Sequence, residues 1–383
     1  MHIKDFSDDT PGKLIPIQVG LELKEDDHAY IPKDLPPSWE FSTELWPLVA
    51  EAKQLIGVIE GIGRNLPNPT ILLRPLVDRE AINSSRLEGT YATAQELLLF
   101  ELDQSEHKSS DSREVFNYRQ ALDFGTNSNL PLSLRLLKQM HQILMCNARG
   151  KDPTPGEFRR LQVAIGASRR FIPPPPQEVE SCMNSMEGYM HSGVKSYDDL
   201  VDCFLVHYQF ETIHPFNDGN GRVGRLLLAL MMKERCGMTK PWLYLSEYFE
   251  KSRGEYTDLL YRVSQNNDWK SWIEFCLKGT IVQAKSTIHR CERLLAIRES
   301  FSEKLSDVGG SVRLSQIVDG VFDSPFVRIA DLARRLVVSY PTAKKDVQRL
   351  AEAGILRELP DVTPSTYYAP EVYNVGYEQI DDL

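Results

Sequence analysis

Residues 214–225 read HPFNDGNGRVGR, and this stretch decides the fold. It follows a helical apolar segment that ends near Glu211, and it precedes the apolar run Leu226-Leu227-Leu228. We therefore expect a glycine-rich loop and a new helix that begins near Arg222. Glycines at a helix start let consecutive backbone N–H groups point at one anion, at the positive end of the helix dipole. The pattern predicts a phosphate-binding loop.

The side chains of this loop supply the rest of a phosphate-transfer site. Arg222 and Arg225 are spaced about one turn apart, and each can bind phosphate oxygens in a bidentate manner. Asp218 offers a hard oxygen that suits Mg²⁺. His214, as a neutral imidazole, can accept a proton from an attacking hydroxyl. A tight turn with surface arginines would explain a GxG pattern alone, but the whole ordered string favours nucleotidyl transfer.

The string resembles the signature of the Fic family, HPFx(D/E)GNGRxxR, at every specified position, and the resemblance extends over roughly residues 80–280. It implies a protein adenylyltransferase that moves AMP from ATP to a Ser, Thr or Tyr hydroxyl of a target protein or of itself. His214 would deprotonate that hydroxyl, and Asp218 would hold Mg²⁺ between the α- and β-phosphates. Arg222 would bind the β-phosphate and Arg225 the γ-phosphate. The loop and helix residues assigned to the nucleotide are Gly219, Asn220, Gly221, Arg222, Val223, Gly224 and Arg225.

An inhibitory motif precedes this core. Residues 84–89 read SSRLEG and match the family pattern (S/T)xxxE(G/N), with Ser84 first and Glu88 fifth. A charged helix end closed by glycine would explain the stretch in isolation. Beside a complete signature it resembles the N-terminal inhibitory helix of class II Fic proteins, in which Glu88 would neutralise Arg225 and block the γ-phosphate. In some relatives this glutamate supports removal of AMP. The resemblance therefore leaves AMP removal open for this chain.

A proline-rich segment and one tyrosine complete the expected site. Residues 165–176 contain four consecutive prolines, which neither continue a helix nor donate to a sheet. They resemble the family's β-hairpin flap, which aligns a target peptide by β-augmentation; the alternative is a plain loop. The segment Gly156–Arg159, just before the flap, also resembles the family, and we expect it to support the structure. Two interpretations of Tyr256 are equally open: its aromatic ring packs against adenine, or it is a core tyrosine.

Other residues invite a functional interpretation that we do not favour. His207 and Glu211 lie four apart and could share a helix face as metal ligands, but no third ligand is evident, so we expect a supporting or packing role. We expect His141 to be a core histidine with satisfied hydrogen bonds. Trp269 and Trp272 are expected to be packing anchors.

The chain of 383 residues is 42% hydrophobic and long enough for several domains. We expect a mostly α fold. The expected parts are an N-terminal arm (1–40), N-terminal helices with the inhibitory motif (41–110), a helical Fic core with a small β-hairpin flap (111–280), a connecting helix and hinge (281–310), and a winged-helix domain (311–383). Within them, Thr93 and Glu96 predict a capping box, and Gly89 predicts a helix end.

The C-terminal expectation rests on a helix-turn-helix pattern at 329–336 and 341–353, followed by two short strands. The second helix carries the polar residues Tyr340, Thr342, Lys344, Lys345, Gln348 and Arg349. These could contact DNA, although the net charge of −10 disfavours tight nonspecific binding. A protein-contact or dimerisation role is the alternative, and we also expect a homodimer through the Fic cores.

Two other functions stay open at this point. A Fic fold could use another donor, such as UTP or a phosphocholine compound, or transfer a phosphate. A nucleotide-sensing transcription regulator is the alternative of another class, although such a sensor would not need His214. Six scattered cysteines, no signal peptide and an apolar run too short for a membrane span predict a reduced, cytoplasmic protein.

Overall fold

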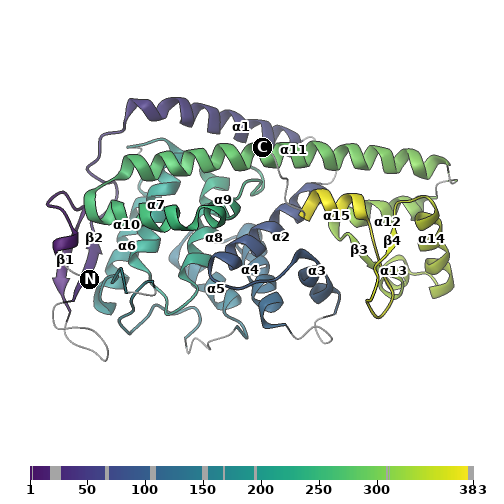
Figure 1. The fold of residues 1–383 in the computed structure, drawn as a ribbon, viewed down its shortest axis with the longest axis horizontal. Helices are drawn as coiled ribbons and strands as arrows, with labels where there is room; N and C mark the ends of the chain where they lie inside the picture. The colour runs from purple at the N-terminus through teal and green to yellow at the C-terminus, as the bar shows by residue number, and fades with distance from the viewer. Residues whose placement is uncertain are drawn as a thin grey trace.

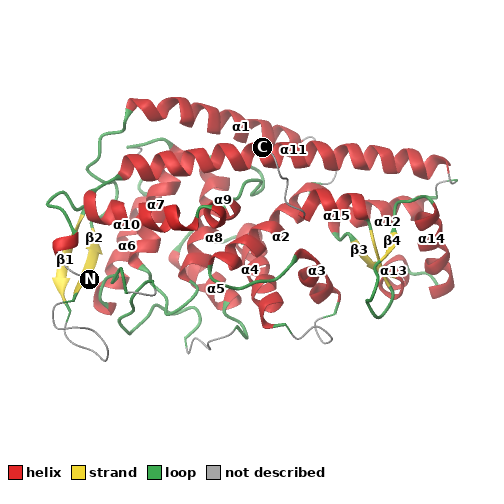
Figure 2. Ribbon diagram, viewed as in Figure 1, coloured by secondary structure: helices red, strands yellow, loops and turns green. Residues whose placement is uncertain are grey.

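The computed structural model describes the chain except residues 2, 18–26, 65–68, 104–108, 149–153, 167–168, 194–195, 308, 310 and 378–383. It is mostly helical, as the sequence predicts (Figure 2). The helices before the phosphate loop are α1 (Trp46–Arg64), α2 (Thr70–Leu87), α3 (Ala94–Leu102), α4 (Ser110–Asn127), α5 (Leu134–Leu144), α6 (Pro176–His191) and α7 (Asp199–Ile213). Those after it are α8 (Asn220–Arg235), α9 (Ser246–Lys251), α10 (Arg253–Asn266), α11 (Trp269–Asp307), α12 (Val312–Asp323), α13 (Ile329–Leu336), α14 (Tyr340–Glu352) and α15 (Pro370–Tyr377).

The pair α7 and α8 forms the centre of the molecule. Residues 200–210 of α7 are all buried, so this helix has no polar face and must be surrounded by other elements. Helices α2, α4 and α5 pack against α8, and α6 packs against α7. The loop that joins α7 to α8 is therefore held on a rigid support.

The two predicted local signals in front of the core are confirmed. Thr93 and Glu96 form the reciprocal capping box that opens α3. Gly89 follows α2 with φ of +82°, a left-handed conformation that glycine adopts without steric cost. The last turn of α2, which carries the inhibitory motif, thus ends at a defined point.

Helix α11 is longer than the sequence suggests. It spans 39 residues and runs along the molecule beside α1 (Figure 1). The domain boundary expected after residue 280 falls inside this continuous helix, so the connecting helix begins at Trp269. Trp272 is fully buried and donates its indole N–H to the Phe204 carbonyl at 3.1 Å. Both tryptophans are packing anchors, as predicted.

The C-terminal part begins with α12, and its sheet has the strand order β3-β5-β4, all antiparallel. Its strands are β3 (Phe326–Arg328), β4 (Arg357–Glu358) and β5 (Thr366–Tyr368). Ser339 caps α14 by accepting from the Thr342 N–H. Of the expected hinge, Asp307 ends α11, and residues 308 and 310 lie outside the described residues. The last helix, α15, was not expected; it packs against α2 and α11.

The N-terminal arm also contains more regular structure than expected. Strands β1 (Gly12–Pro16) and β2 (His28–Pro32) form an antiparallel hairpin, while residues 18–26 between them lie outside the described part. The Tyr30 N–H donates to the Ile172 carbonyl at 2.9 Å, so β2 lies beside the expected flap. The flap itself contains one bridge, between Ile165 and Phe171, and Pro176 already begins α6.

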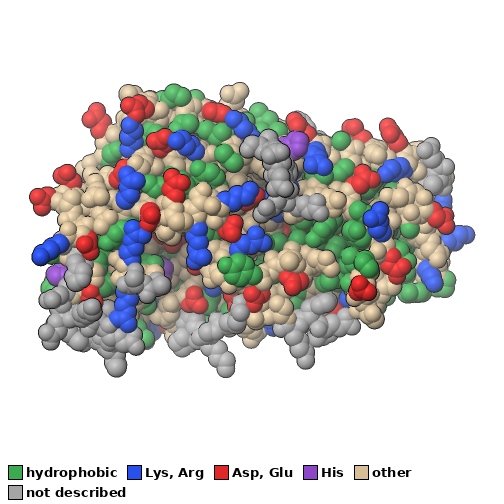
Figure 3. Space-filling view, viewed as in Figure 1, with side chains coloured by type: hydrophobic (Ala, Val, Ile, Leu, Met, Phe, Trp, Pro, Cys, Tyr) green, Lys and Arg blue, Asp and Glu red, His purple; other side chains and the backbone are tan. Residues whose placement is uncertain are grey.

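The distribution of charge on the surface bears on the expected DNA partner. Acidic and basic side chains are interspersed over the face seen in Figure 3. This face therefore has no extended field of one sign, such as a tight nucleic-acid binder presents. No described helix combines the length and the hydropathy that a bilayer span requires.

Candidate active site

The phosphate loop has an unusual backbone at both ends. Helix α7 ends in His214, which has φ of 52°, and Gly219 precedes α8 with φ of 76°. A left-handed histidine costs about 1–2 kcal/mol, so the surrounding structure must hold it. Arg159 does so: its Nε donates to the His214 carbonyl at 2.8 Å, and its backbone N–H donates to the Pro215 carbonyl at 2.8 Å. The predicted supporting role of this segment therefore has a physical basis.

Asn220 closes the loop with its side chain. Its Oδ1 accepts from the Phe216 N–H at 2.7 Å, and its Nδ2 donates to the Phe216 carbonyl at 2.8 Å. We expected Asn220 to line the anion hole. Its side chain instead braces the loop, and only its backbone N–H, in the first turn of α8, remains for an anion.

This arrangement predicts that Asn220→Ala weakens both the fold and the site. Two buried hydrogen bonds are lost, and the Phe216 N–H is left without its partner, at a cost of about 1–3 kcal/mol. Thermal unfolding should show a lower Tm. Asn184→Ala, the same change at an exposed position of α6, should leave the Tm within about 1 °C of wild type; equal Tm values for both variants would contradict the bracing role.

His141 supports the loop from α5. Its Nδ1 accepts from the Gly156 N–H at 2.8 Å, so Nε2 carries the proton and donates to the Asp218 carbonyl at 3.0 Å. The ring also stacks on Phe216 with centroids 3.8 Å apart. His141 is therefore the buried, satisfied histidine that the sequence predicts, and it also fixes the carbonyl of the expected metal ligand.

His214 is partly buried and has one ring nitrogen available for chemistry. Its Nδ1 donates to the Glu211 carbonyl at 3.4 Å, which leaves Nε2 as the unprotonated acceptor. Burial, followed by the positive charge of Arg159, lowers the pKa of His214 to about 4. The imidazole is thus neutral at physiological pH, as a general base must be.

The inhibitory motif contacts Arg225 directly. The Arg225 Nε donates to Ser84 Oγ at 2.8 Å, and Nη2 donates to both the Ser84 carbonyl and Glu88 Oε1 at 2.8 Å. The side chain of Arg225 is 3% exposed and that of Glu88 is 38% exposed, so a buried arginine meets a carboxylate that is still partly open to water. Burial raises the pKa of the Glu88 carboxyl, but Arg225 outweighs it, and the pKa is lowered overall. Glu88 is therefore ionised when it is bound to Arg225.

Glu88 also lies over the start of α8. A Cβ atom added to Gly221 would come within 2.1 Å of Glu88 Oε1, so the carboxylate fills the space that the missing side chain leaves. Backbone N–H groups at a helix start attract an anion. In this structure that anion is Glu88, which lies at the place where the sequence predicts a phosphate.

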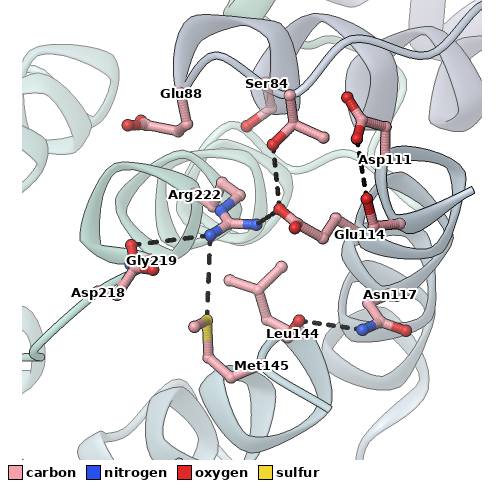
Figure 4. A network of polar contacts seen from close by, with 12 residues as sticks. Ser84, Glu88, Asp111, Glu114, Asn117, Leu144, Met145, Asp218, Gly219 and Arg222 are labelled. Atoms are coloured by element: carbon pink, nitrogen blue, oxygen red, sulfur yellow. Dashed lines mark hydrogen bonds and ion pairs between the residues drawn. The ribbon is translucent and has the colours of Figure 1, made fainter. Parts of the chain in front are cut away.

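The second arginine has a partner that the sequence analysis did not identify. Arg222 Nη1 donates to Glu114 Oε2 at 3.2 Å, and Thr90 Oγ1 donates to the same oxygen at 3.0 Å. Figure 4 shows Arg222 between Glu114 on one side and Asp218 and Met145 on the other. Glu114 lies 108 residues before Arg222 on α4, so no local pattern could reveal the contact.

Asp218 lies at the mouth of the site, with a side chain that is 57% exposed. Its Oδ1 accepts from the Gly219 N–H at 2.6 Å and lies 3.9 Å from Arg222 Nη2. Within the described residues no cluster of three or more candidate ligands could hold a metal on its own. A single exposed carboxylate fits Mg²⁺ that is otherwise bound by phosphate oxygens and water.

Two of the expected nucleotide-binding residues present no polar side chain to the site. Val223 is fully buried, and its N–H donates to the Gly219 carbonyl within the first turn of α8. The Gly224 carbonyl accepts a hydrogen bond from His207 Nδ1 at 3.1 Å. An added Cβ at Gly224 would come within 2.2 Å of Glu211 Oε1, so this glycine makes room for a carboxyl group.

A cavity of about 560 Å³ extends from His214, Gly221 and Arg225 to the flap. One end holds His214, Gly221 and Arg225, together with Glu88. The other end is formed by the flap and α10. The cavity residues there that the sequence analysis did not single out are Arg253, Thr257, Leu260, Tyr261 and Ser264. The cavity thus has ionised groups at the His214 end, and at the flap end the apolar side chains of Leu260 and Tyr261 lie among polar ones such as Arg253.

Tyr256 lines this cavity but is mostly buried. Its ring stacks on Phe249 with centroids 4.5 Å apart, and its hydroxyl donates to His207 Nε2 at 2.9 Å. Burial, followed by Arg225, lowers the pKa of His207 to about 3, so this histidine is a neutral acceptor. The supporting role expected for His207 fits this contact. Tyr256 is a core tyrosine with one edge on the cavity, and its contact with adenine stays a prediction.

Comparison with known proteins agrees with the geometry. The sequence profile of the Fic/DOC family N-terminal region matches residues 46–127, and that of the Fic/DOC family matches residues 131–232. The chain contains both domains of the Fic/DOC family. The second match includes the phosphate loop, and the first includes residues 84–89, the expected inhibitory motif.

Two relatives show how far the sequence similarity extends. A protein adenylyltransferase Fic from Culex quinquefasciatus is 31% identical over 160 residues, which are 40% of this chain and 29% of that protein. A probable protein adenylyltransferase from Aquifex aeolicus is 36% identical over 80 residues, which are 21% of this chain and 24% of the relative. The Fic protein thus spans less than a third of the length of the relatives that it matches.

The fold has a solved counterpart. A Fic family protein from Desulfovibrio desulfuricans aligns with a TM-score of 0.57 at 20% identity, covering 87% of this chain and 98% of that one. The Fic helical fold predicted from the sequence is therefore confirmed.

Proposed function

We propose that this Fic protein transfers AMP from ATP to a hydroxyl group of a target protein and that Glu88 inhibits the transfer. The observation that carries the proposal is the neutral His214 Nε2 beside an anion site at the start of α8. Relatives named protein adenylyltransferase Fic support the same chemistry. A pure nucleotide sensor would not require a histidine base with a depressed pKa in its anion site.

In the proposed mechanism the triphosphate takes the place of Glu88. Backbone N–H groups at the start of α8 bind the α-phosphate, while Arg222 and Arg225 bind the outer phosphates. Asp218 would hold Mg²⁺, which supplies positive charge to the phosphates. At the flap end of the cavity, the side chains of Leu260 and Tyr261 would enclose adenosine.

The transfer step then needs one proton acceptor. The target hydroxyl oxygen attacks the α-phosphorus, and its proton passes to His214 Nε2. The bond between the α-phosphorus and the bridging oxygen breaks, and pyrophosphate leaves. The products are an AMP phosphodiester on the target and pyrophosphate.

The flap is the proposed binding site for the target backbone. Strand β2 already bonds to the Ile172 side of the flap, whereas Ile165 and Gly166 line the cavity. A target segment would therefore pair along the Ile165 side, with its hydroxyl directed into the cavity. AMP removal, with Glu88 returned to the site, is a second proposed reaction of the same groups.

Labelled ATP tests the proposed function. With Mg²⁺, the Glu88→Gly variant should attach label to protein from ATP labelled at the α-phosphate and none from ATP labelled at the γ-phosphate. Chelation of Mg²⁺ should remove the signal. Label from the γ-phosphate alone would show a phosphotransferase, and no label from either donor would overturn the proposal.

A further inference from the structure

One carboxyl group of the site has no part in the mechanism above. Glu211, on the last turn of α7, lines the nucleotide cavity, and its Oε1 is buried without a hydrogen-bond partner in the described part of the chain. A buried, unpartnered carboxylate oxygen is costly, so the structure must give this group either a proton or a ligand.

Glu211 lies over α8 in the same way as Glu88. Glu88 lies over Gly221, and Glu211 lies over Gly224, one turn further along α8. Both carboxyl groups interact with Arg225, which attracts them, and they repel each other. The inhibited site thus contains two acids and one buried arginine, an arrangement in which one acid keeps its proton.

The other groups around Glu211 are consistent with this. They are the neutral His214, the Tyr256 hydroxyl and, at the cavity wall, Arg253. Burial and the charge of Glu88 raise the pKa of Glu211 to about 8, against the opposing effect of Arg225. While Glu88 occupies the site, Glu211 is therefore neutral at physiological pH.

We propose that Glu211 is a proton-linked counter-ion of Arg225, protonated when Glu88 or a phosphate is bound to Arg225 and ionised when neither is. When Glu88 leaves, Arg225 would otherwise stay buried without a negative partner, which is strongly unfavourable. Glu211 then releases its proton to solvent and balances the charge. When the triphosphate binds, Glu211 takes a proton back from solvent and no longer repels it. This inference deepens the proposed function and rests on it.

The proposal predicts that ATP binding takes up protons. The suitable protein is Glu88→Gly combined with His214→Ala, which vacates the site and prevents turnover. Calorimetric titration with ATP and Mg²⁺ at pH 7.5, in two buffers of different ionisation enthalpy, should show uptake of about half a proton beyond that of the nucleotide. The dissociation constant should also rise with pH between 7 and 9.

Glu211→Gln in the same background is the matched control, because glutamine has the shape of the neutral acid. It should bind ATP at least as tightly, remove the additional proton uptake and show a flatter pH dependence. Equal proton uptake with and without Glu211 would overturn the inference and leave the proposed function standing. ATP that fails to bind either protein would overturn the proposed function, and the inference with it.

Discussion

Glu88→Gly should raise the rate of AMP transfer by about ten- to a hundredfold. The reason is the Arg225–Glu88 contact of 2.8 Å, which removes the positive charge that the γ-phosphate needs. Breaking a buried ion pair costs about 3–5 kcal/mol. Because the Glu88 side chain is 38% exposed, we expect a smaller effect, of about 1.5–3 kcal/mol. A difference of 1.4 kcal/mol corresponds to about a factor of ten in rate.

The measurement is initial-rate labelling with α-labelled ATP and Mg²⁺. Glu88→Gln, which keeps the size but loses the charge, should be activated less than Glu88→Gly. Glu299→Gly makes the same change at an exposed position of α11 and should leave the rate at the wild-type level. Identical rates for wild type and Glu88→Gly would show that the contact does not inhibit.

His214→Ala in the Glu88→Gly background should lower the transfer rate by about a hundred- to ten-thousandfold, the usual contribution of a general base. The anion site and both arginines remain, so ATP affinity should change little. Loss of affinity equal to the loss of rate would assign His214 to binding. His191→Ala, an exposed histidine on α6, is the matched control and should keep full activity.

The pH dependence follows from the same residue. The pKa of His214 is lowered to about 4, so the base is neutral above that value and becomes protonated below it. Activity of Glu88→Gly should therefore persist to about pH 5 and fall as the pH is lowered through 4. Activity that falls between pH 7 and 6 would mean that the histidine is solvated and has an ordinary pKa.

The sequence predicted the phosphate loop because its information is local. Glycine conformations, helix caps and the positions of His214 and Asp218 follow from neighbours within a few residues. The individual contacts that hold this loop join residues that are distant along the chain. Glu114 contacts Arg222, and Arg159 contacts the backbone of His214, across separations of 108 and 55 residues. Nothing in hydrophobic periodicity specifies such pairs.

Long-range contacts also explain what the sequence analysis missed in the fold. A boundary was expected after residue 280, but α11 continues through it because the helical pattern does not record which domain the helix packs against. The β1–β2 hairpin was missed because its strands pair across residues 17–27 and bury Tyr30 against the flap, a long-range contact. Local patterns gave the elements, whereas tertiary packing decided their neighbours.

Helix α2 packs against several elements, and two of its contacts have a practical consequence for fragments of this chain. Its last turn contacts Arg225, while Asp78, ten residues before Glu88 and about 15 Å along the axis, accepts from the Tyr377 hydroxyl at 2.9 Å. Arg290 on α11 also donates to the Val375 carbonyl of α15 at 2.6 Å. A fragment that ends before α15 loses this anchorage, so the inhibition that it shows is expected to be weaker than that of the intact chain.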